Sequence, residues 1–268
     1  MRTLKKILKY LANLAVTLLL WIYYIPGFVL FFSPFYLLAL IFYRNRQVAF
    51  QKLNSFFYRG FFNLVHLLIP RVRFEISPDV LAIRSSIILC NHLSYLDPIL
   101  LISLFPKQKT IVKSDIFRLP VFGWLLRQSG YLPSLAEGPN VTLMMKQVQE
   151  MKAYLASGGN LFIFPEGTRS RDGRIGPFNK GAFSIARICK APISVLVIRN
   201  TQRLFPPGRF LFDTTESFAI SVGLAGRLEP DYENPALSLT GLMEQVRSLM
   251  ENSLKTTYPA GGKNYESH

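Results

Sequence analysis

The chain has 268 residues, of which 50% are hydrophobic, and it carries 31 Lys and Arg against 16 Asp and Glu, for a formal net charge of +15. This length suffices for one large α/β domain with an appendage, and only two cysteines, Cys90 and Cys189, argue against a disulfide framework. The positive charge favours an anionic partner, but no zinc finger, RNA-binding signature or basic zipper helix is present, so we expect membrane lipid rather than nucleic acid.

The first segment is predicted to associate with a membrane. Residues 10–43 carry no charge, and basic residues flank them on both sides. The run is too long for one span of about twenty residues and too short for two. Pro26, Gly27 and Pro34 predict a turn that makes it a half-inserted or re-entrant helical hairpin, with both ends cytoplasmic. The alternatives are a signal peptide, although a small-residue cleavage site is missing, and a tilted span followed by an interfacial helix.

Residues 56–69 repeat aromatic and aliphatic side chains at helical spacing until Pro70 ends the pattern. Such a helix either lies flat on the bilayer or packs its aromatic side on the following domain, and the pattern does not distinguish these two arrangements. Neither arrangement gives His66 a chemical role.

The rest of the chain alternates apolar runs with helical patterns. Strands are predicted at residues 71–76, 86–89, 110–112, 161–164, 193–198, 209–212 and 218–222. Helices are predicted at 98–104, 121–127, 141–155, 182–189 and 235–254. The pattern indicates a single α/β domain, and we divide the chain into a membrane-associated helical region at 1–70, an α/β domain at 71–254 and a polar tail at 255–268.

A histidine and an aspartate come directly after the strand predicted at 86–89. His92 and Asp97 are five residues apart in the sequence Asn-His-Leu-Ser-Tyr-Leu-Asp. A neutral, correctly aimed imidazole takes a proton from a hydroxyl, and a nearby carboxylate fixes its tautomer and stabilises the imidazolium. We therefore predict that His92 is the general base of an acyl transfer and Asp97 its partner, although Asp97 alternatively only caps a helix. Cys90 is expected to pack within the strand, and Ser94 lacks the surroundings of a nucleophile elbow.

A second cluster, Phe-Pro-Glu-Gly-Thr-Arg-Ser at residues 164–170, follows another predicted strand. Since ligands of α/β sheets bind where the strands end, we expect both clusters to converge at one edge of the sheet. The guanidinium of Arg169 suits the bidentate geometry of phosphate, and Glu166 is expected to orient Arg169 or the acceptor. The alternative is a surface ion pair between these two side chains.

These segments resemble the glycerolipid acyltransferase family, especially the bacterial 1-acylglycerol-3-phosphate acyltransferases. The resemblance covers residues 86–200 and includes both clusters, Lys113 ahead of Pro120 and Gly123, and the sequence Pro-Phe-Asn-Lys-Gly at 177–181. It implies an acyltransferase domain with a mixed sheet flanked by helices. It also implies direct transfer of a fatty acyl group from acyl-CoA or acyl carrier protein to a lipid hydroxyl, without a metal or other cofactor, at the cytoplasmic face of a membrane such as the bacterial inner membrane.

The same resemblance implies roles for further residues. Glu166, Gly167, Thr168 and Arg169 would form the acceptor pocket, while Lys113 would assist the thioester or the developing oxyanion.

One departure leaves the acceptor open. The family's arginine shortly after the position of Gly130 is absent, so either Arg169, Lys180 or Arg174 binds the phosphate, or the acceptor is not lysophosphatidate. An aminolipid or polyketide-derived acceptor and a non-catalytic lipid-binding homologue remain alternatives. The acyl chain length and the oligomeric state are not predictable from one sequence.

Overall fold

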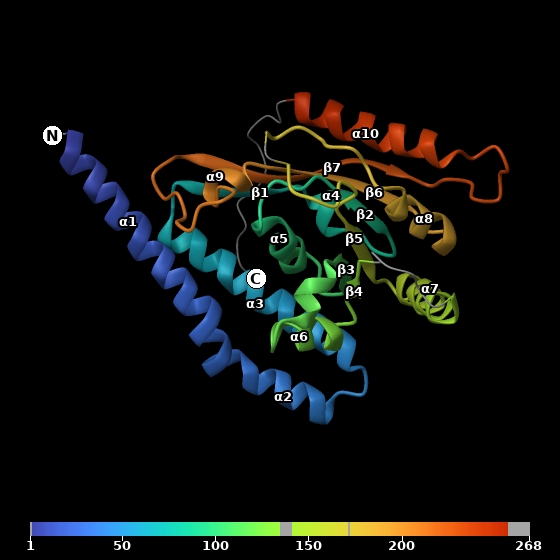
Figure 1. Cartoon of the computed structure of the whole chain (residues 1–268), viewed down its shortest axis with the longest axis horizontal. Helices are drawn as coiled ribbons and strands as arrows, with labels where there is room; N and C mark the ends of the chain where they lie inside the picture. Colours follow the sequence, from blue (N-terminus) through green and yellow to red (C-terminus); the bar gives the residue numbers. More distant parts are fainter. Residues whose placement is uncertain (1, 135–140, 171, 257–268) are drawn as a thin grey trace.

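The computed structural model describes residues 2–134, 141–170 and 172–256 (Figure 1). The helical elements are α1 (Arg2–Ile22), η1 (Tyr23–Phe32), α2 (Ser33–Phe42), α3 (Arg46–Leu68), α4 (Pro78–Leu81), α5 (Leu96–Leu104), η2 (Ser114–Arg118), α6 (Phe122–Gln128), α7 (Val141–Ala156), α8 (Lys180–Cys189), α9 (Thr201–Leu204) and α10 (Leu239–Lys255). The strands are β1 (Val72–Ile76), β2 (Ile87–Cys90), β3 (Gln108–Val112), β4 (Leu132–Pro133), β5 (Asn160–Ile163), β6 (Ile193–Arg199) and β7 (Phe218–Leu228).

Within the described residues the strands form one mixed sheet in the order β1-β7-β6-β2-β5-β3-β4. Strands β6, β2, β5, β3 and β4 run parallel to one another. Strand β7 is antiparallel to β6, and β1 pairs parallel to β7 at the edge of the sheet. The central strands β2 and β5 are buried along their whole length, as parallel strands covered on both faces are. The predicted mixed sheet flanked by helices is confirmed.

Two hydrophobic clusters cover the two faces of the sheet. Along β2, Ile88 and Cys90 join the cluster formed with α3 and α5, while Ile87 and Leu89 join the cluster formed with α7, α8 and α10. This alternation follows from the two-residue period of a strand. Figure 1 shows α10 over one face of the sheet and α5 with α3 over the other.

The predicted hairpin within residues 10–43 is wrong. The chain stays helical through α1, η1 and α2, and Figure 1 shows these elements as one bent rod along which α3 returns. Pro26 lies inside η1, whose wider π-helical turn accommodates a residue without an N–H, and Pro34 lies in the first turn of α2, where proline is tolerated. The reversal occurs instead between α2 and α3, where the Asn45 side chain accepts a hydrogen bond from Val48 N at 3.2 Å and caps α3.

The aromatic helix packs on the α/β domain rather than lying open on a bilayer. On α3, Phe57, Phe61, Phe62 and Val65 are buried in the same cluster as the strands and α5. Phe57 also lies among aromatic rings of η1, with its ring centroid 5.1 Å from that of Tyr23. The first region and the sheet therefore share one core.

The strand predicted at 209–212 is also wrong, because this segment lies against α1. The backbone N–H of Phe212 donates to Thr17 Oγ1 at 3.0 Å, a side-chain acceptor on α1 rather than a neighbouring strand. The helix predicted at 235–254 begins later, at Leu239, after a Ser238 cap. Of the predicted tail, residues 257–268 lie outside the described residues.

Candidate active site

Four loops meet at one edge of the sheet. His92 comes two residues after β2, Glu166 three residues after β5, Lys113 directly after β3 and Thr201 two residues after β6. These strands are parallel neighbours, so their carboxyl ends lie at the same edge. The two sequence clusters are thereby brought together, and this is the edge at which α/β sheets commonly bind ligands.

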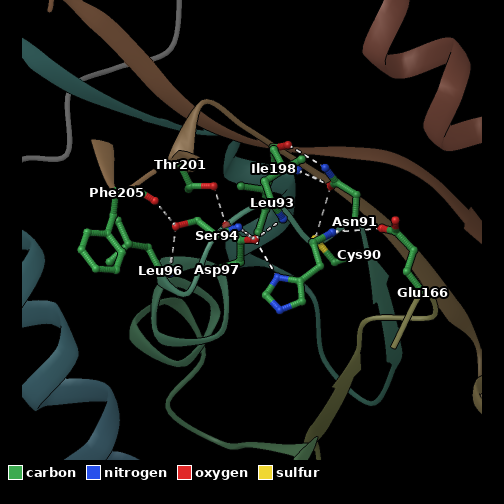
Figure 2. A network of polar contacts seen from close by, with 11 residues as sticks. Cys90, Asn91, Leu93, Ser94, Leu96, Asp97, Glu166, Ile198, Thr201 and Phe205 are labelled. Carbon is green, nitrogen blue, oxygen red and sulfur yellow. Dashed lines mark hydrogen bonds and ion pairs between the residues drawn. The ribbon is translucent and has the colours of Figure 1, made fainter. Parts of the chain in front are cut away.

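The imidazole of His92 is bound to a fully buried carboxylate. His92 Nδ1 lies 2.9 Å from Asp97 Oδ2, and the exposed fractions of the two side chains are 14% and 0%. The same carboxylate oxygen accepts the backbone N–H groups of Leu93 at 2.5 Å and Ser94 at 2.7 Å, and Thr201 Oγ1 donates to Oδ1 at 2.5 Å (Figure 2). Asp97 thus has hydrogen-bond donors on both oxygens, and it holds the imidazole in the tautomer with Nδ1 protonated and Nε2 able to accept a proton.

The ring and backbone of His92 are fixed from the β5 side. Its ring stacks on Phe164, with centroids 4.2 Å apart and an interplanar angle of 21°. Its N–H donates to Glu166 Oε1 at 3.1 Å, and its carbonyl oxygen accepts from Ser170 N at 2.7 Å. The loop that follows β5 therefore positions the general-base candidate as well as carrying its own polar side chains.

Glu166 connects three backbone segments. Besides the His92 contact, its Oε2 accepts the N–H of Gly176 at 2.8 Å. Burial raises the pKa of this carboxyl, and the two backbone N–H groups and His92 oppose the rise. The described ion pairs do not join Glu166 to Arg169, so the alternative of a surface pair is not observed.

Arg169 lies flat on an aromatic ring of the first cluster. Its guanidinium carbon is 3.4 Å from the ring centroid of Tyr95, which is cation–π geometry. Its Nη1 is buried and has no hydrogen-bond partner among the residues that the structure describes. A buried, unpaired guanidinium N–H beside His92's loop suits an anionic oxygen of a ligand.

The remaining predicted site residues are exposed. Gly167 adopts φ +68°, and a Cβ there would lie 2.7 Å from Asn179 Nδ2, so this tight turn requires glycine. Thr168, Lys113 and Lys180 are exposed. The Asn179 N–H donates to Pro165 O at 2.7 Å and joins the start of α8, where Lys180 lies, to the Glu166 loop.

Lys113 precedes η2 at the end of the neighbouring strand β3. The segment that would hold the family's missing arginine, beyond Ser134, includes residues 135–140, which lie outside the described residues.

Sequence reasoning did not single out Thr201 or give roles to Asn91 and Tyr95. Asn91 Nδ2 donates to Ile198 O at 2.9 Å and its Oδ1 accepts Ile198 N at 2.8 Å, which ties the end of β2 to β6. Thr201 comes just after a predicted strand, which favours a place at the same edge of the sheet as His92. Its position beside Asp97 follows only from the pairing of β6 with β2, which the sequence did not reveal.

Two other nucleophile candidates are engaged elsewhere. Ser94 Oγ donates to Phe205 O at 3.1 Å and accepts from Leu96 N at 3.3 Å (Figure 2). Cys90 is buried within β2, and burial raises the pKa of its thiol well above the usual range. Among the described residues no group of three His, Cys, Asp or Glu side chains could hold a metal ion.

A protein-family model matches most of the part of the chain that forms this edge. Residues 71–199 match the acyltransferase family model. The match spans both clusters, so the resemblance indicated by the sequence is confirmed over this acyltransferase region.

Named relatives agree with the match. A chloroplastic 1-acyl-sn-glycerol-3-phosphate acyltransferase of Brassica napus is 40% identical over 119 residues, which are 44% of this chain and 34% of that protein. The enzyme of the same name from Saccharomyces cerevisiae is 30% identical over 160 residues, 58% of this chain and 52% of that protein. The chain thus spans about a third to a half of the length of these relatives.

A solved structure shares the fold. The crystal structure of the 1-acyl-sn-glycerophosphate acyltransferase PlsC from Thermotoga maritima superposes with a TM-score of 0.69, covering 95% of this chain and 98% of that one at 21% identity. The helices that precede the acyltransferase region are therefore part of a shared fold.

Proposed function

We propose that this protein transfers a fatty acyl group from an acyl thioester to the hydroxyl of a lysophospholipid, forming phosphatidate from 1-acylglycerol-3-phosphate. The observation that carries the proposal is the bond between His92 and the buried Asp97. Arg169 lies at the same edge of the sheet, and its Nη1 has no hydrogen-bond partner among the described residues. The names of the relatives that match the acyltransferase region support the same acceptor.

The proposed chemistry needs one base and no covalent acyl-enzyme. His92 Nε2 accepts the proton of the acceptor hydroxyl while its oxygen attacks the thioester carbonyl, and Asp97 stabilises the imidazolium. The tetrahedral intermediate then collapses: the carbon–sulfur bond breaks, and the thiolate takes the proton from His92. Coenzyme A or acyl carrier protein leaves as the thiol, and we propose no metal or other cofactor.

Arg169 is the proposed phosphate ligand. Its stacking on Tyr95 fixes the guanidinium plane, so the free Nη1 is preorganised for a phosphate oxygen. Glu166 and Gly167 would hold the loop that presents it, Thr168 would line the acceptor pocket, and Lys113 and Lys180 would supply further positive charge. An acceptor without a glycerol phosphate remains the second candidate, because the arginine expected after Gly130 is absent from the sequence.

We further propose that the reaction takes place at a membrane surface, on the cytoplasmic face of a bacterial inner membrane. The continuous helix at residues 3–42 has a mean hydropathy of 2.1 over its most apolar window, and only 11% of that window is buried in the protein. Such an exposed apolar surface is typical of a membrane contact.

The test is thiol release from acyl-CoA by detergent-purified protein with lysophosphatidate, a lysophosphatidylcholine-type lipid or a lyso-aminolipid as acceptor. We expect His92-dependent release with lysophosphatidate, and His92→Ala should lower turnover by about three orders of magnitude or more while membrane binding is kept. Activity of His92→Ala equal to that of the parent would refute the general base. Activity confined to another acceptor would refute lysophosphatidate as the substrate. Lipid binding without thiol release, from acyl-CoA or from acyl carrier protein, would indicate the non-catalytic alternative.

A further inference from the structure

A basic groove lies between α1 and the segment that follows α9. The segment, residues 205–213, forms one wall and the first half of α1 the other, around a cavity of about 420 Å³. Its basic lining residues are Lys6, Lys9 and Arg209, and aromatic rings of Tyr10 and Phe210 line it as well. The groove therefore joins positive charge to apolar surface.

Only one of the three cations is neutralised by a described partner. Lys9 Nζ lies 3.5 Å from Asp213 Oδ2, whereas Lys6 and Arg209 form no ion pair with any residue that the structure describes. Burial would raise the pKa of Asp213, but hydrogen bonds from Thr215 and the charge of Lys9 outweigh it and hold that pKa below the usual range. The groove thus keeps two uncompensated positive charges for an anionic ligand.

Both walls of the groove are held in place. Asn13 Oδ1 accepts from Thr214 N at 3.1 Å and from Thr214 Oγ1 at 2.7 Å. The rings of Trp21 and Phe210 stack with centroids 5.9 Å apart and an interplanar angle of 5°. Together with the bond from Phe212 N to Thr17, these contacts make the groove a preformed site rather than a gap between mobile parts.

The surroundings favour a phospholipid over a soluble anion. Ile7, Leu8 and Leu11, on the same stretch of α1, are 51%, 56% and 52% exposed. A headgroup in the groove would leave its acyl chains free to lie along this apolar face, which a nucleotide or inorganic phosphate cannot use. The cavity is large enough for a headgroup, and the chains would lie outside it.

The same segment leads back to the candidate active site. The carbonyl of Phe205 accepts Ser94 Oγ, and Thr201, four residues earlier, donates to Asp97. Asp213 N donates to Leu204 O at 2.9 Å and closes the segment onto α9. A ligand that contacts both α1 and residues 205–213 therefore adds to the contacts already holding this segment, and through it to the groups that support Asp97.

We propose that this groove binds the headgroup of an anionic phospholipid of the bilayer, separate from the reacting acceptor, and that its occupancy supports the arrangement around Asp97. Phospholipid binding in the groove is independent of the proposed function, whereas the effect on turnover rests on the proposed function.

Binding can be measured with an internal reporter. In full-length protein carrying Trp124→Phe, Trp21 is the remaining tryptophan and lies against Phe210. We expect a saturable change in its fluorescence emission with a short-chain anionic phospholipid. The change should be much weaker with a zwitterionic phospholipid of the same chain length, with inorganic phosphate or with coenzyme A. Lys6→Gln with Arg209→Gln should raise the half-saturation concentration about thirtyfold, at about 1 kcal/mol for each basic residue.

A matched control removes two charges elsewhere. Lys152→Gln with Arg187→Gln alters exposed residues of α7 and α8 on the other face of the sheet and should leave binding unchanged. Equal binding by the groove variant and the parent would overturn the site, and so would tighter binding of coenzyme A than of the phospholipid. Lys6→Arg with Arg209→Lys keeps both positive charges and should bind the anionic phospholipid as tightly as the parent does.

The effect on turnover is a separate measurement. With acyl-CoA saturating and the acceptor kept dilute in zwitterionic vesicles, below the concentration at which it fills the groove itself, added anionic phospholipid should raise the apparent kcat of the parent and not of the groove variant. Binding without any rise in kcat would overturn the link to Asp97 while leaving the site in place. If no acceptor is acylated at all, the proposed function fails and the fluorescence titration still decides whether the groove binds phospholipid.

Discussion

At the scale of single residues, the proposed chemistry depends on one buried carboxylate, that of Asp97, and on the groups that hold it. The oxygens of Asp97 accept hydrogen bonds from His92, from two consecutive backbone N–H groups and from Thr201. The five-residue spacing allowed the contact with His92 to be predicted from the sequence. The two backbone contacts are equally local but were not predicted. The fourth comes from a residue 104 positions away and depends on which strand lies beside β2.

Replacing Asp97 by Asn should remove most of the turnover. The amide keeps one oxygen for the donors that point at Oδ2, but it carries no negative charge to stabilise the imidazolium, and its NH2 group replaces the oxygen that accepts from Thr201. We expect kcat to fall by about three to four orders of magnitude, measured as thiol release at saturating lysophosphatidate. Asp115→Asn, at an exposed aspartate of η2, is the control. A loss below tenfold for Asp97→Asn would contradict the assigned partnership.

Thr201→Val should lower activity and stability together. The substitution keeps the shape but leaves Asp97 Oδ1 without its hydroxyl donor in a buried site, which costs about 1–3 kcal/mol of unfolding free energy. We expect kcat to fall more than KM rises, and Thr201→Ser to restore kcat. If Ser and Val behave alike, the hydroxyl does not position Asp97.

Glu166 predicts a pH dependence of stability. Because burial raises its pKa in the folded state, the folded protein binds this proton more tightly than the unfolded chain. Its contribution is therefore greatest below the unfolded pKa of about 4.3 and is lost as the pH rises through the higher folded value. The unfolding free energy of the parent minus that of Glu166→Gln, followed by denaturant titration in detergent, should decline over this window. A difference that rises with pH would show that the two backbone N–H bonds outweigh burial.

At the scale of elements, most of the α/β alternation was predictable and its failures have physical causes. Apolar runs bounded by turn residues identified β2, β5 and β6, because buried parallel strands are continuously hydrophobic. The three residues after Arg209 are also apolar, yet this segment packs on α1, and hydropathy does not reveal which surface a segment will meet. The hairpin failed for a related reason, since a proline that breaks an α-helix is accommodated in a π-helical turn.

Neighbouring phenylalanines of α3 test the packing of the first helices on the domain. Phe57 is 4% exposed and lies among Tyr23, Phe28 and Phe32, whereas Phe56 is 65% exposed. Phe57→Ala should cost about 3–5 kcal/mol of unfolding free energy and Phe56→Ala less than about 1 kcal/mol, by thermal or chemical unfolding in detergent. Similar losses for both would mean that α3 does not bury this face against η1.

At the scale of the whole molecule, the first helices carry an extended exposed apolar surface, on which the proposed membrane association rests. The polar side chains of this rod that are buried, such as Thr17, face the α/β domain, while leucines and aromatic residues cover the outer side. Charge and hydropathy allowed membrane association to be predicted, but the docking of α1 on residues 205–214 required contacts between segments about 200 positions apart.

Charges placed on the outer side should release the protein from membranes. Leu30→Glu with Phe31→Glu alters residues that are 66% and 69% exposed, so folding should be unaffected while insertion into the hydrocarbon becomes costly. We expect the variant to move from the pelleted to the soluble fraction in vesicle sedimentation, and Lys152→Glu on α7 to stay in the pellet. Persistence of the double variant in the pellet would place the membrane contact elsewhere.

The unbroken helix at residues 3–42 has a consequence for the bilayer itself. Its 40 residues extend about 60 Å at the α-helical rise, twice the thickness of the hydrocarbon layer of about 30 Å. A rod of this length would project well beyond the hydrocarbon if it stood upright, so at the proposed membrane contact we expect it to lie along one leaflet. The height of His92 above the lipids is then set by the protein, and catalysis should be indifferent to whether the host membrane is thick or thin.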